Sequence, residues 1–489
     1  MNNTTTKIVR SAVRVYAAAA LSAMMAGISP AQTFKTLFNF DGSDGANSTS
    51  GLVQGLNGEL YGTTLYGGTG SGGTVFRITS GGKLTTLYDF SYCIVIGCPD
   101  GAGPNAGVIQ ATNGDFYGIT TGGGIYDSGT VFRLTPSGKL TTLYTFCSQS
   151  GCSDGQDPYG GLVQASNGDL YGTTAGGGNV NHPGGTIFKI TPSGTLTTLY
   201  SFCSQSDCPD GAGPEARLVQ ASDGGLYGTT SAGGVNIGGT IFKITPAGVL
   251  TTLYSFCALT DCPDGSFPGG GLIQTTDGDF YGTTTSGGAY GYGTVFKFTP
   301  GGTIATLHSF CAETGCPDGA DPYPPLIQAS DGNFYGTTLK GGTGGTIFSI
   351  TPGGVLTTLY SFCTGGGECT DGSQPYGGVA QATNGDFYGT TNTGGTSPDF
   401  GTVFSLSTGL GPFVELQTSS GKVGSSVKIL GTQLTGATSV TFDGTAATFI
   451  VSSATLITAT VPTGANTGTV EVMTPNGTLS SSVPFRVRP

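Results

Sequence analysis

Between residues 34 and 408 the chain repeats one pattern of apolar and polar positions. One copy, residues 160–202, contains four short segments, LVQA, DLYGTT, GTIFKIT and LTTLYSF. In the third segment Phe188 and Ile190 alternate with Ile187, Lys189 and Thr191, as expected of a strand whose successive side chains point to opposite faces. Asn-Gly, Asp-Gly and Pro-Ser-Gly turns bound the segments. The pattern predicts four β-strands per copy.

The copies recur at a nearly constant spacing. A Tyr-Gly-Thr-Thr phrase or a close variant begins at Tyr61, Tyr117, Tyr171, Tyr227, Tyr281, Tyr335 and Tyr388. Seven four-stranded units of this length are typical of the blades of a β-propeller. A solenoid or β-helix is the alternative, because a period alone does not separate these architectures.

The two ends of the repeat favour the propeller. Residues 34–40 form a lone fourth strand, and the last unit ends after its third strand, residues 401–407. Pairing of these two segments would remove both sheet edges. We therefore predict an all-β chain, with a seven-bladed β-propeller over residues 32–408 that its N-terminal strand closes. A linker at 409–411 and an immunoglobulin-like β-sandwich at 412–489 follow, since short alternating strands with frequent turns continue without the period.

Twelve cysteines occur in six close pairs, one at almost every junction between units. Structural zinc sites bring two such pairs together, and six equivalent pairs spread over a ring would not meet. An even cysteine count behind an export signal favours local disulfides. The predicted disulfide pairs are Cys93/Cys98, Cys147/Cys152, Cys203/Cys208, Cys257/Cys262, Cys311/Cys316 and Cys363/Cys369.

The N-terminus has the features of a secretory signal peptide. Lys7, Arg10 and Arg14 precede an apolar stretch at 15–28, which is short for a membrane-spanning helix, and small residues follow it. We predict a signal peptide at 1–31 and a secreted, extracellular or cell-surface protein. A net charge of −12 and a pI near 4.4 argue against binding to nucleic acid or to an anionic membrane. We expect no membrane insertion after signal removal, and a monomer.

Two of the four connections in each unit vary in length: the link between strands two and three, and the link that carries the cysteines. Both emerge on one face of an up-and-down unit, and loops on a rigid scaffold commonly carry function. The candidate ligand residues on or near this face are Tyr66, Tyr126, His182, Glu215, Arg217, Tyr290, Tyr292, Lys340 and Asp399.

Two further polar residues recur in every unit. The aspartates can cap their own turns, or can bind Ca²⁺ as a set. The glutamines can bond between blades or line a channel. The aspartates are Asp44, Asp100, Asp154, Asp210, Asp264, Asp318 and Asp371, and the glutamines are Gln54, Gln110, Gln164, Gln220, Gln274, Gln328 and Gln381. His308 replaces a fourth-strand tyrosine, and we expect it to pack within its strand.

Two family resemblances follow from the motifs. Phrases such as GSSVKILGTQL, VTFDGTAATF and the final FRV resemble an IPT/TIG domain. The repeated LVQASDG, YGTT and GTIFKITP phrases resemble the GloVer (Gloeobacter/Verrucomicrobia) tandem-repeat family, and this resemblance implies an exported surface protein.

No Ser-His-Asp or zinc-ligand spacing is visible, and we predict no catalytic residues and no cofactor, apart from the Ca²⁺ alternative. The main hypothesis is a non-catalytic binding or adhesion protein. Its ligand is an extracellular polysaccharide, a cell-wall component or a protein. A structural surface or matrix component and a polysaccharide hydrolase or lyase are the alternatives.

Overall fold

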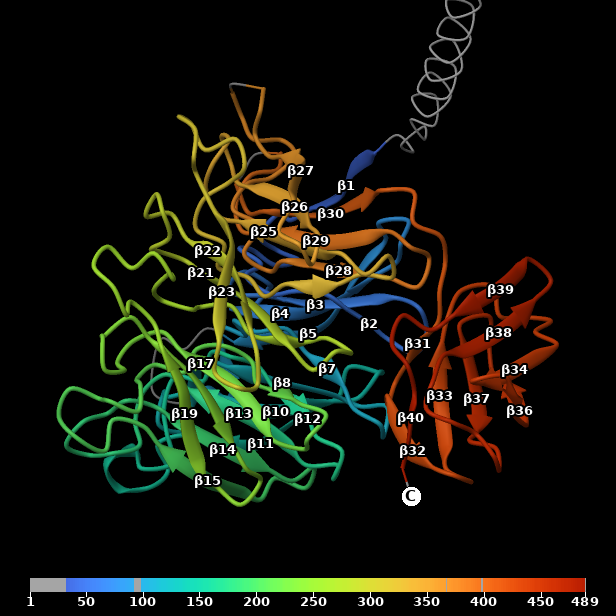
Figure 1. Ribbon diagram of the computed structural model, residues 1–489, viewed down its shortest axis with the longest axis horizontal. Helices are drawn as coiled ribbons and strands as arrows, with labels where there is room; N and C mark the ends of the chain where they lie inside the picture. The colour runs from blue at the N-terminus through green and yellow to red at the C-terminus, as the bar shows by residue number, and fades with distance from the viewer. Residues whose placement is uncertain (1–31, 92–97, 366, 397–398, 489) are drawn as a thin grey trace, which may run out of the picture.

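The computed structural model describes residues 32–91, 98–365, 367–396 and 399–488, and the predicted signal peptide lies outside them. Within the described part of the repeat region there are seven four-stranded antiparallel sheets (Figure 1). Each corresponds to one predicted unit, and we number them 1 to 7 in chain order. The predicted four-strand unit is therefore correct for all seven copies.

Sheets 1 to 6 use strands that follow one another in the sequence, except that sheet 2 omits β9 (Gly122–Gly124). Sheet 1 is β2 (Val53–Gln54), β3 (Leu60–Thr64), β4 (Ser71–Ile78) and β5 (Leu84–Ser91), and sheet 2 is β7 (Ile109–Gln110), β8 (Phe116–Thr120), β10 (Thr130–Leu134) and β11 (Leu140–Thr145). Sheet 3 is β12 (Val163–Gln164), β13 (Leu170–Thr174), β14 (Thr186–Ile190) and β15 (Leu196–Ser201), and sheet 4 is β16 (Val219–Gln220), β17 (Leu226–Thr230), β18 (Thr240–Ile244) and β19 (Leu250–Ser255). Sheet 5 is β20 (Ile273–Gln274), β21 (Phe280–Thr284), β22 (Thr294–Phe298) and β23 (Ile304–Ser309), and sheet 6 is β24 (Ile327–Gln328), β25 (Phe334–Thr338), β26 (Thr346–Ile350) and β27 (Leu356–Ser361).

Sheet 7 joins the two ends of the repeat region. It contains β28 (Val379–Gln381), β29 (Phe387–Thr391), β30 (Thr402–Ser407) and, as its outer strand, β1 (Thr33–Asn39). The register of β1 and β30 runs from Thr33 opposite Ser407 to Asn39 opposite Thr402. The predicted pairing of residues 34–40 with 401–407 is therefore confirmed.

The core lies between neighbouring sheets. One cluster combines Ile187 and Phe202 of sheet 3 with Leu226, Phe242 and Ile244 of sheet 4, and all are almost fully buried. Equivalent clusters occupy the other junctions, including one that joins sheet 7 to sheet 1. Apolar side chains on both faces of each sheet explain why the repeat buries its strands so completely.

Hydrogen bonds repeat at the same junctions. The recurrent glutamine of one sheet accepts a backbone N–H from the preceding sheet, as where Leu56 donates to Gln110 Oε1 at 2.8 Å. The last sheet bonds to the first in the same way, because Thr383 donates to Gln54 Oε1 at 2.9 Å. The prediction that these glutamines bond between units is confirmed at these junctions.

The C-terminal region forms two four-stranded sheets and a parallel pair. One sheet is β31 (Glu415–Leu416), β33 (Ser426–Leu430), β37 (Leu456–Thr460) and β36 (Phe449–Val451); the other is β35 (Thr445–Ala446), β34 (Ser439–Phe442), β38 (Val470–Thr474) and β39 (Gly477–Ser480); the pair is β32 (Ser420–Lys422) with β40 (Arg486–Arg488). Val427, Ile429, Val440, Phe442 and Phe485 form its buried core. No helix within the described ranges is long and apolar enough to cross a membrane.

This region lies beside the repeat sheets (Figure 1) and touches the turns that follow their first strands. Lys428 Nζ donates to the carbonyl of Thr112 at 3.1 Å, and Thr455 Oγ1 donates to that of Leu56 at 3.2 Å. Arg486 donates to the carbonyl of Ser222 at 2.6 Å. The C-terminal region thus spans turns of sheets 1, 2 and 4, on the side opposite the variable loops.

Candidate functional site

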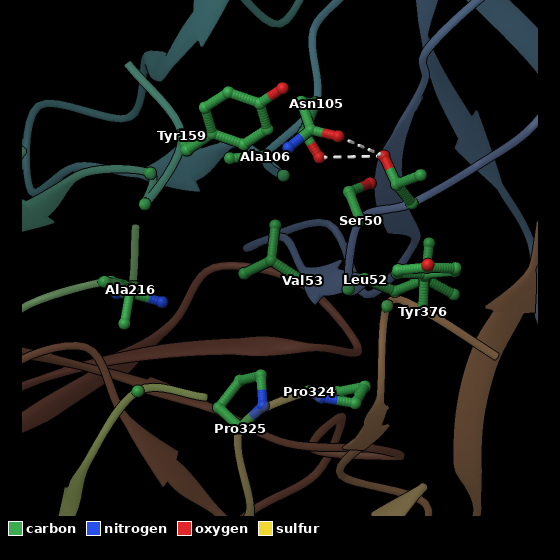
Figure 2. Close-up of a pocket in the computed structure, with 18 of the residues that line it drawn as sticks. Ser50, Leu52, Val53, Asn105, Ala106, Tyr159, Ala216, Pro324, Pro325 and Tyr376 are labelled. Atoms are coloured by element: carbon green, nitrogen blue, oxygen red, sulfur yellow. Dashed lines mark hydrogen bonds between the residues drawn. The ribbon is translucent and has the colours of Figure 1, made fainter. Parts of the chain in front are cut away.

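A cavity of about 280 Å³ opens where the first-strand segments of all seven sheets meet (Figure 2). This volume is close to the lower end of the range for small-molecule sites. Figure 2 shows Tyr159, Asn105, Tyr376, Pro324 and Ala216, from five different sheets, around one central space. The repeat therefore builds one shared cavity from seven equivalent segments.

The position five residues before each recurrent glutamine lines this cavity, and its residue differs from sheet to sheet. We call these seven residues the lining positions. They are Thr49, Asn105, Tyr159, Glu215, Gly269, Tyr323 and Tyr376. The surrounding backbone repeats closely, so the scaffold is constant whereas the chemistry of the lining is not.

Three tyrosines supply most of the aromatic surface. The rings of Tyr323 and Tyr376 meet edge to face, with centroids 5.8 Å apart. Gly269 makes room for Tyr323, because a Cβ at Gly269 would lie 2.7 Å from its ring. Burial raises the pKa of Tyr323 most strongly, and the nearby charge of Glu215 raises it further. Tyr323 therefore remains a neutral hydroxyl donor in ordinary buffers.

Sheet 4 contributes the charged groups of the lining, Glu215 and Arg217. Burial raises the pKa of the Glu215 carboxyl, and the enclosing walls lower the pKa of the Arg217 guanidinium by desolvation. Within the described ranges neither side chain has an ion-pair partner. On the opposite part of the lining, Thr49 Oγ1 donates to Asn105 Oδ1 at 2.8 Å, and this bond fixes both side chains.

Of the predicted ligand residues, the structure brings only Glu215 and Arg217 into the cavity. Four tyrosines from the loops between second and third strands are 47% to 53% exposed and do not line it: Tyr66, Tyr126, Tyr290 and Tyr292. His182 is exposed, Lys340 pairs with Asp321 at 2.7 Å, and Asp399 accepts from the N–H of Gly394.

The two variable connections of each unit lie side by side, as predicted. Backbone bridges join the two variable connections in each unit, as between Ala46 and Tyr66 or between Ala320 and Lys340. Sequence reasoning named Glu215 but missed Tyr159, Tyr323 and Tyr376, because it did not compare all seven equivalent positions. Comparing the residue types at the seven lining positions would have identified these tyrosines from the sequence.

Five of the six predicted cysteine pairs are disulfides in the structure. Cys98 is also disulfide-bonded, and Cys93 lies outside the described residues. β6 (Cys98–Ala102) pairs with β9 (Gly122–Gly124) beside this junction, and a short 3₁₀ turn, Ser150–Cys152, lies within the next stapled loop. The five disulfides are Cys147–Cys152, Cys203–Cys208, Cys257–Cys262, Cys311–Cys316 and Cys363–Cys369.

The recurrent aspartates fasten these loops. Tyr200 donates to Asp210 at 2.8 Å, and the amide of Cys203 donates to the same carboxylate at 3.1 Å. His308 takes the place of the tyrosine and lies 2.9 Å from Asp318. The expected cap on the aspartate's own turn is thus corrected at the stapled loops, because there the carboxylate bonds across the loop instead. Asp44, whose junction has no cysteines, accepts from the N–H of Asp41 within its own turn at 3.0 Å.

The stapled loops themselves lie outside the cavity lining. They were predicted to form part of the ligand face, yet no described cysteine, Cys208 and Cys316 included, is among the residues that line the cavity. The aspartate bonds explain this placement, because they tie each loop to the fourth strand of its sheet, whereas the first-strand segments surround the cavity. The disulfides therefore stiffen the loops without contributing to the lining.

His308 also packs edge to face on Phe310, as expected of a residue within its strand. The aspartates lie one per sheet. Among the residues that the structure describes, no group of three or more His, Cys, Asp or Glu side chains could hold a metal ion.

Two family models match the sequence. The Gloeobacter/Verrucomicrobia repeat matches residues 25–221 and 207–369, which together cover more than half of the chain. The chain belongs to the Gloeobacter/Verrucomicrobia repeat family. In this family member an IPT/TIG domain follows at 413–487, so the C-terminal sheets are an immunoglobulin-like domain. Both resemblances predicted from the motifs are confirmed.

A search of solved structures finds matches to this Gloeobacter/Verrucomicrobia repeat protein at low identity. One is the extracellular domain of a candidate hybrid two-component system from Bacteroides thetaiotaomicron, with 12% identity, coverage of 94% of this chain and 60% of that chain, and a TM-score of 0.48. Another is a candidate 6-phosphogluconolactonase from Bacteroides uniformis, with 18% identity, 63% and 83% coverage, and a TM-score of 0.43. A third is an auxiliary nutrient binding protein from B. thetaiotaomicron, with 13% identity, 62% and 73% coverage, and a TM-score of 0.39. No curated protein matches the sequence.

Proposed function

We propose that the protein is an exported, non-catalytic binding protein whose ligand occupies the central cavity. In this proposal the seven sheets are the blades of a β-propeller, and β1 closes it. Hydrogen bonds and core clusters that return from sheet 7 to sheet 1 support the closed arrangement. So does the bond from Thr390 Oγ1 to the carbonyl of Ser50 at 2.9 Å, which repeats a contact between earlier sheets.

The residues at the lining positions give the main support for a binding function. A propeller that needed only to fold could use glycine or threonine at every one of them, because Gly269 and Thr49 occupy two. Tyrosine at three positions and glutamate at another add aromatic and polar surface that the scaffold does not require. Amphipathic rings with hydroxyl groups suit a ligand that has both apolar faces and hydrogen-bonding edges, such as a sugar.

Binding is favoured over hydrolysis by the acid groups of the lining. A glycosidase of the usual kind uses two carboxyl groups that flank the scissile bond. Among the described residues that line the cavity, Glu215 contributes the one carboxyl group. We assign it a role in accepting hydrogen bonds from the ligand.

Export rests on the predicted signal peptide and on the disulfides, which persist in oxidising compartments. The IPT/TIG domain acts as a spacer. It supports the side of the propeller that carries the turns after the first strands, and it leaves the opposite side, with the cavity, open. Mature chain 32–489 is therefore the form that we expect outside the cell.

The proposed function is tested with a panel of soluble neutral and acidic oligosaccharides and isothermal titration calorimetry on mature chain 32–489. Tyr159→Thr and Tyr376→Thr place in sheets 3 and 7 the residue that sheet 1 already carries. We expect them to weaken binding at least tenfold without changing the circular dichroism spectrum. Tyr290→Ala with Tyr292→Ala is the matched control on the outer loops, by which we mean the loops between the second and third strands of each sheet. Loss of binding in the control and not in the cavity variants would refute the cavity as the site.

A second candidate function, a self-associating structural component, is favoured by apolar side chains on the outer loops. Val235 and Ile237 are 79% and 69% exposed. If these loops mediate assembly, Val235→Ser with Ile237→Ser would convert a concentration-dependent oligomer into a monomer in light scattering. A wild-type protein that stays monomeric at high concentration rules this candidate out and fits the expected monomer.

A further inference from the structure

We propose that Arg217 is an anchor for an anionic group on a sugar, so that the cavity selects an acidic saccharide unit over a neutral one. This inference rests on the proposed function and adds the charge class of its ligand.

Arg217 is a departure from the repeat. The equivalent position, three residues before the recurrent glutamine, is glycine in five of the seven sheets and proline in sheet 6. Those residues are Gly51, Gly107, Gly161, Gly271, Pro325 and Gly378. The fold therefore accepts a residue with no charge and no long side chain here, and the guanidinium has no role that the other sheets share.

The surroundings of Arg217 leave its charge uncompensated. Its side chain lies in the cavity wall between sheets 3 and 5 and exposes its surface to the lumen of the cavity. The surrounding walls still displace bulk water, and this desolvation lowers the pKa of the guanidinium. Among the described residues none forms an ion pair with its side chain. A partly desolvated cation without a partner is costly, and an anion that enters the cavity would reduce that cost.

The lining favours an acidic sugar over another anion. A guanidinium binds a planar carboxylate through two parallel hydrogen bonds, and it binds sulfate in a related way. Tyr159, Tyr323 and Tyr376 provide rings against which a sugar can pack, and Glu215 can accept from its hydroxyls. A volume of about 280 Å³ suits the end of a saccharide rather than a long chain. A net charge of −12 opposes a polyanion laid across the surface, so we assign the site to the end of a chain.

The test uses calorimetry at low and moderate salt with three probes of equal length: an oligogalacturonate, a sulfated oligosaccharide and a neutral oligosaccharide. Arg217→Gly installs the residue of five sister sheets, so we expect the variant to fold. We expect wild-type protein to bind an acidic probe, and Arg217→Gly to bind it about 10- to 100-fold more weakly, as for loss of a charge-assisted pair. Arg217→Lys should retain part of the affinity. Lys83→Gln, which removes an exposed charge on a turn, is the matched control and should have no effect.

The outcomes separate this inference from the proposed function. Preference for the carboxylated or for the sulfated probe identifies the anionic group, and either supports the inference if Arg217→Gly abolishes the preference. Wild-type binding to the neutral probe alone, still sensitive to Tyr376→Thr, overturns the inference and leaves the proposed function standing. Equal binding of an acidic probe by wild type and Arg217→Gly overturns it as well. Absence of binding to any probe overturns both proposals.

Discussion

The strand that joins the two ends of the repeat region should contribute measurably to the stability of all seven sheets. Phe34 of β1 is half-buried, and its ring stacks on that of Tyr360 with centroids 3.8 Å apart and planes 5° apart. Its ring also packs on those of Phe362 and Phe404, with centroids 5.6 and 5.5 Å apart. One side chain of β1 therefore touches both sheet 6 and sheet 7, and Phe34→Ala removes these contacts together.

The expected loss follows from the burial. Replacing a fully buried phenylalanine by alanine costs about 3–5 kcal/mol of unfolding free energy, and part of the Phe34 ring remains in water. We therefore expect Phe34→Ala to lower the unfolding free energy by about 2 kcal/mol. The other fourth strands carry leucine or isoleucine at this position, so Phe34→Leu is the matched control and should cost less than about 1 kcal/mol.

Urea denaturation followed by tyrosine fluorescence measures both losses, and hydrogen exchange locates them. In Phe34→Ala the amides of β30 should exchange faster, and so should those of sheet 1, which packs on sheet 7. Loss of protection confined to β1 and β30, with unchanged protection in sheet 1, would show that the other sheets do not depend on the β1–β30 pairing, which we call the seam. Equal stability of Phe34→Ala and wild type would refute the packing argument itself.

Three further predictions concern other parts of the chain. Gly269→Ala should weaken ligand binding in calorimetry because the new Cβ displaces the Tyr323 ring, and unchanged affinity would argue that this ring does not contact ligand. Desolvation by the surrounding protein raises the pKa of the Glu415 carboxyl to about 7, so the stability of the wild-type protein should fall as pH rises from 4.5 to 7. Glu415→Gln should flatten that part of a profile of melting temperature against pH, and a profile identical to that of wild type would contradict the pKa shift. Replacing Cys257 and Cys262 by serine should lower the unfolding free energy by at most about 2 kcal/mol, because their loop is short, and a global collapse in circular dichroism would contradict this.

The strands and their seam could be predicted from the sequence because each rests on a strong, repeated signal. Alternation around Phe188 and the turns beside it recur in all seven copies, so each copy supports the others. The seam needed one more observation, the offset of one strand between the two ends. Both signals are local, and pairing geometry turns them into structure directly.

The cavity could not be predicted in the same way. Its residues come from seven segments far apart in sequence, and only packing brings Tyr159 near Tyr376. Glu215 and Arg217 were among the predicted ligand residues, whereas Tyr159, Tyr323 and Tyr376 were not, although Glu215 and these tyrosines occupy equivalent positions. The role of the aspartates was also beyond local reasoning, since the bond from Tyr200 to Asp210 spans a whole stapled loop.

The seam also sets the order of events during biogenesis. β1 is synthesised before every other described strand, and its partner β30 ends at Ser407. At typical synthesis rates the two are separated by a delay on the order of half a minute. Throughout that time Phe34 and its neighbours have an unpaired edge and no aromatic partners. Folding of this protein should therefore depend on whatever shields β1 until the last repeat is synthesised.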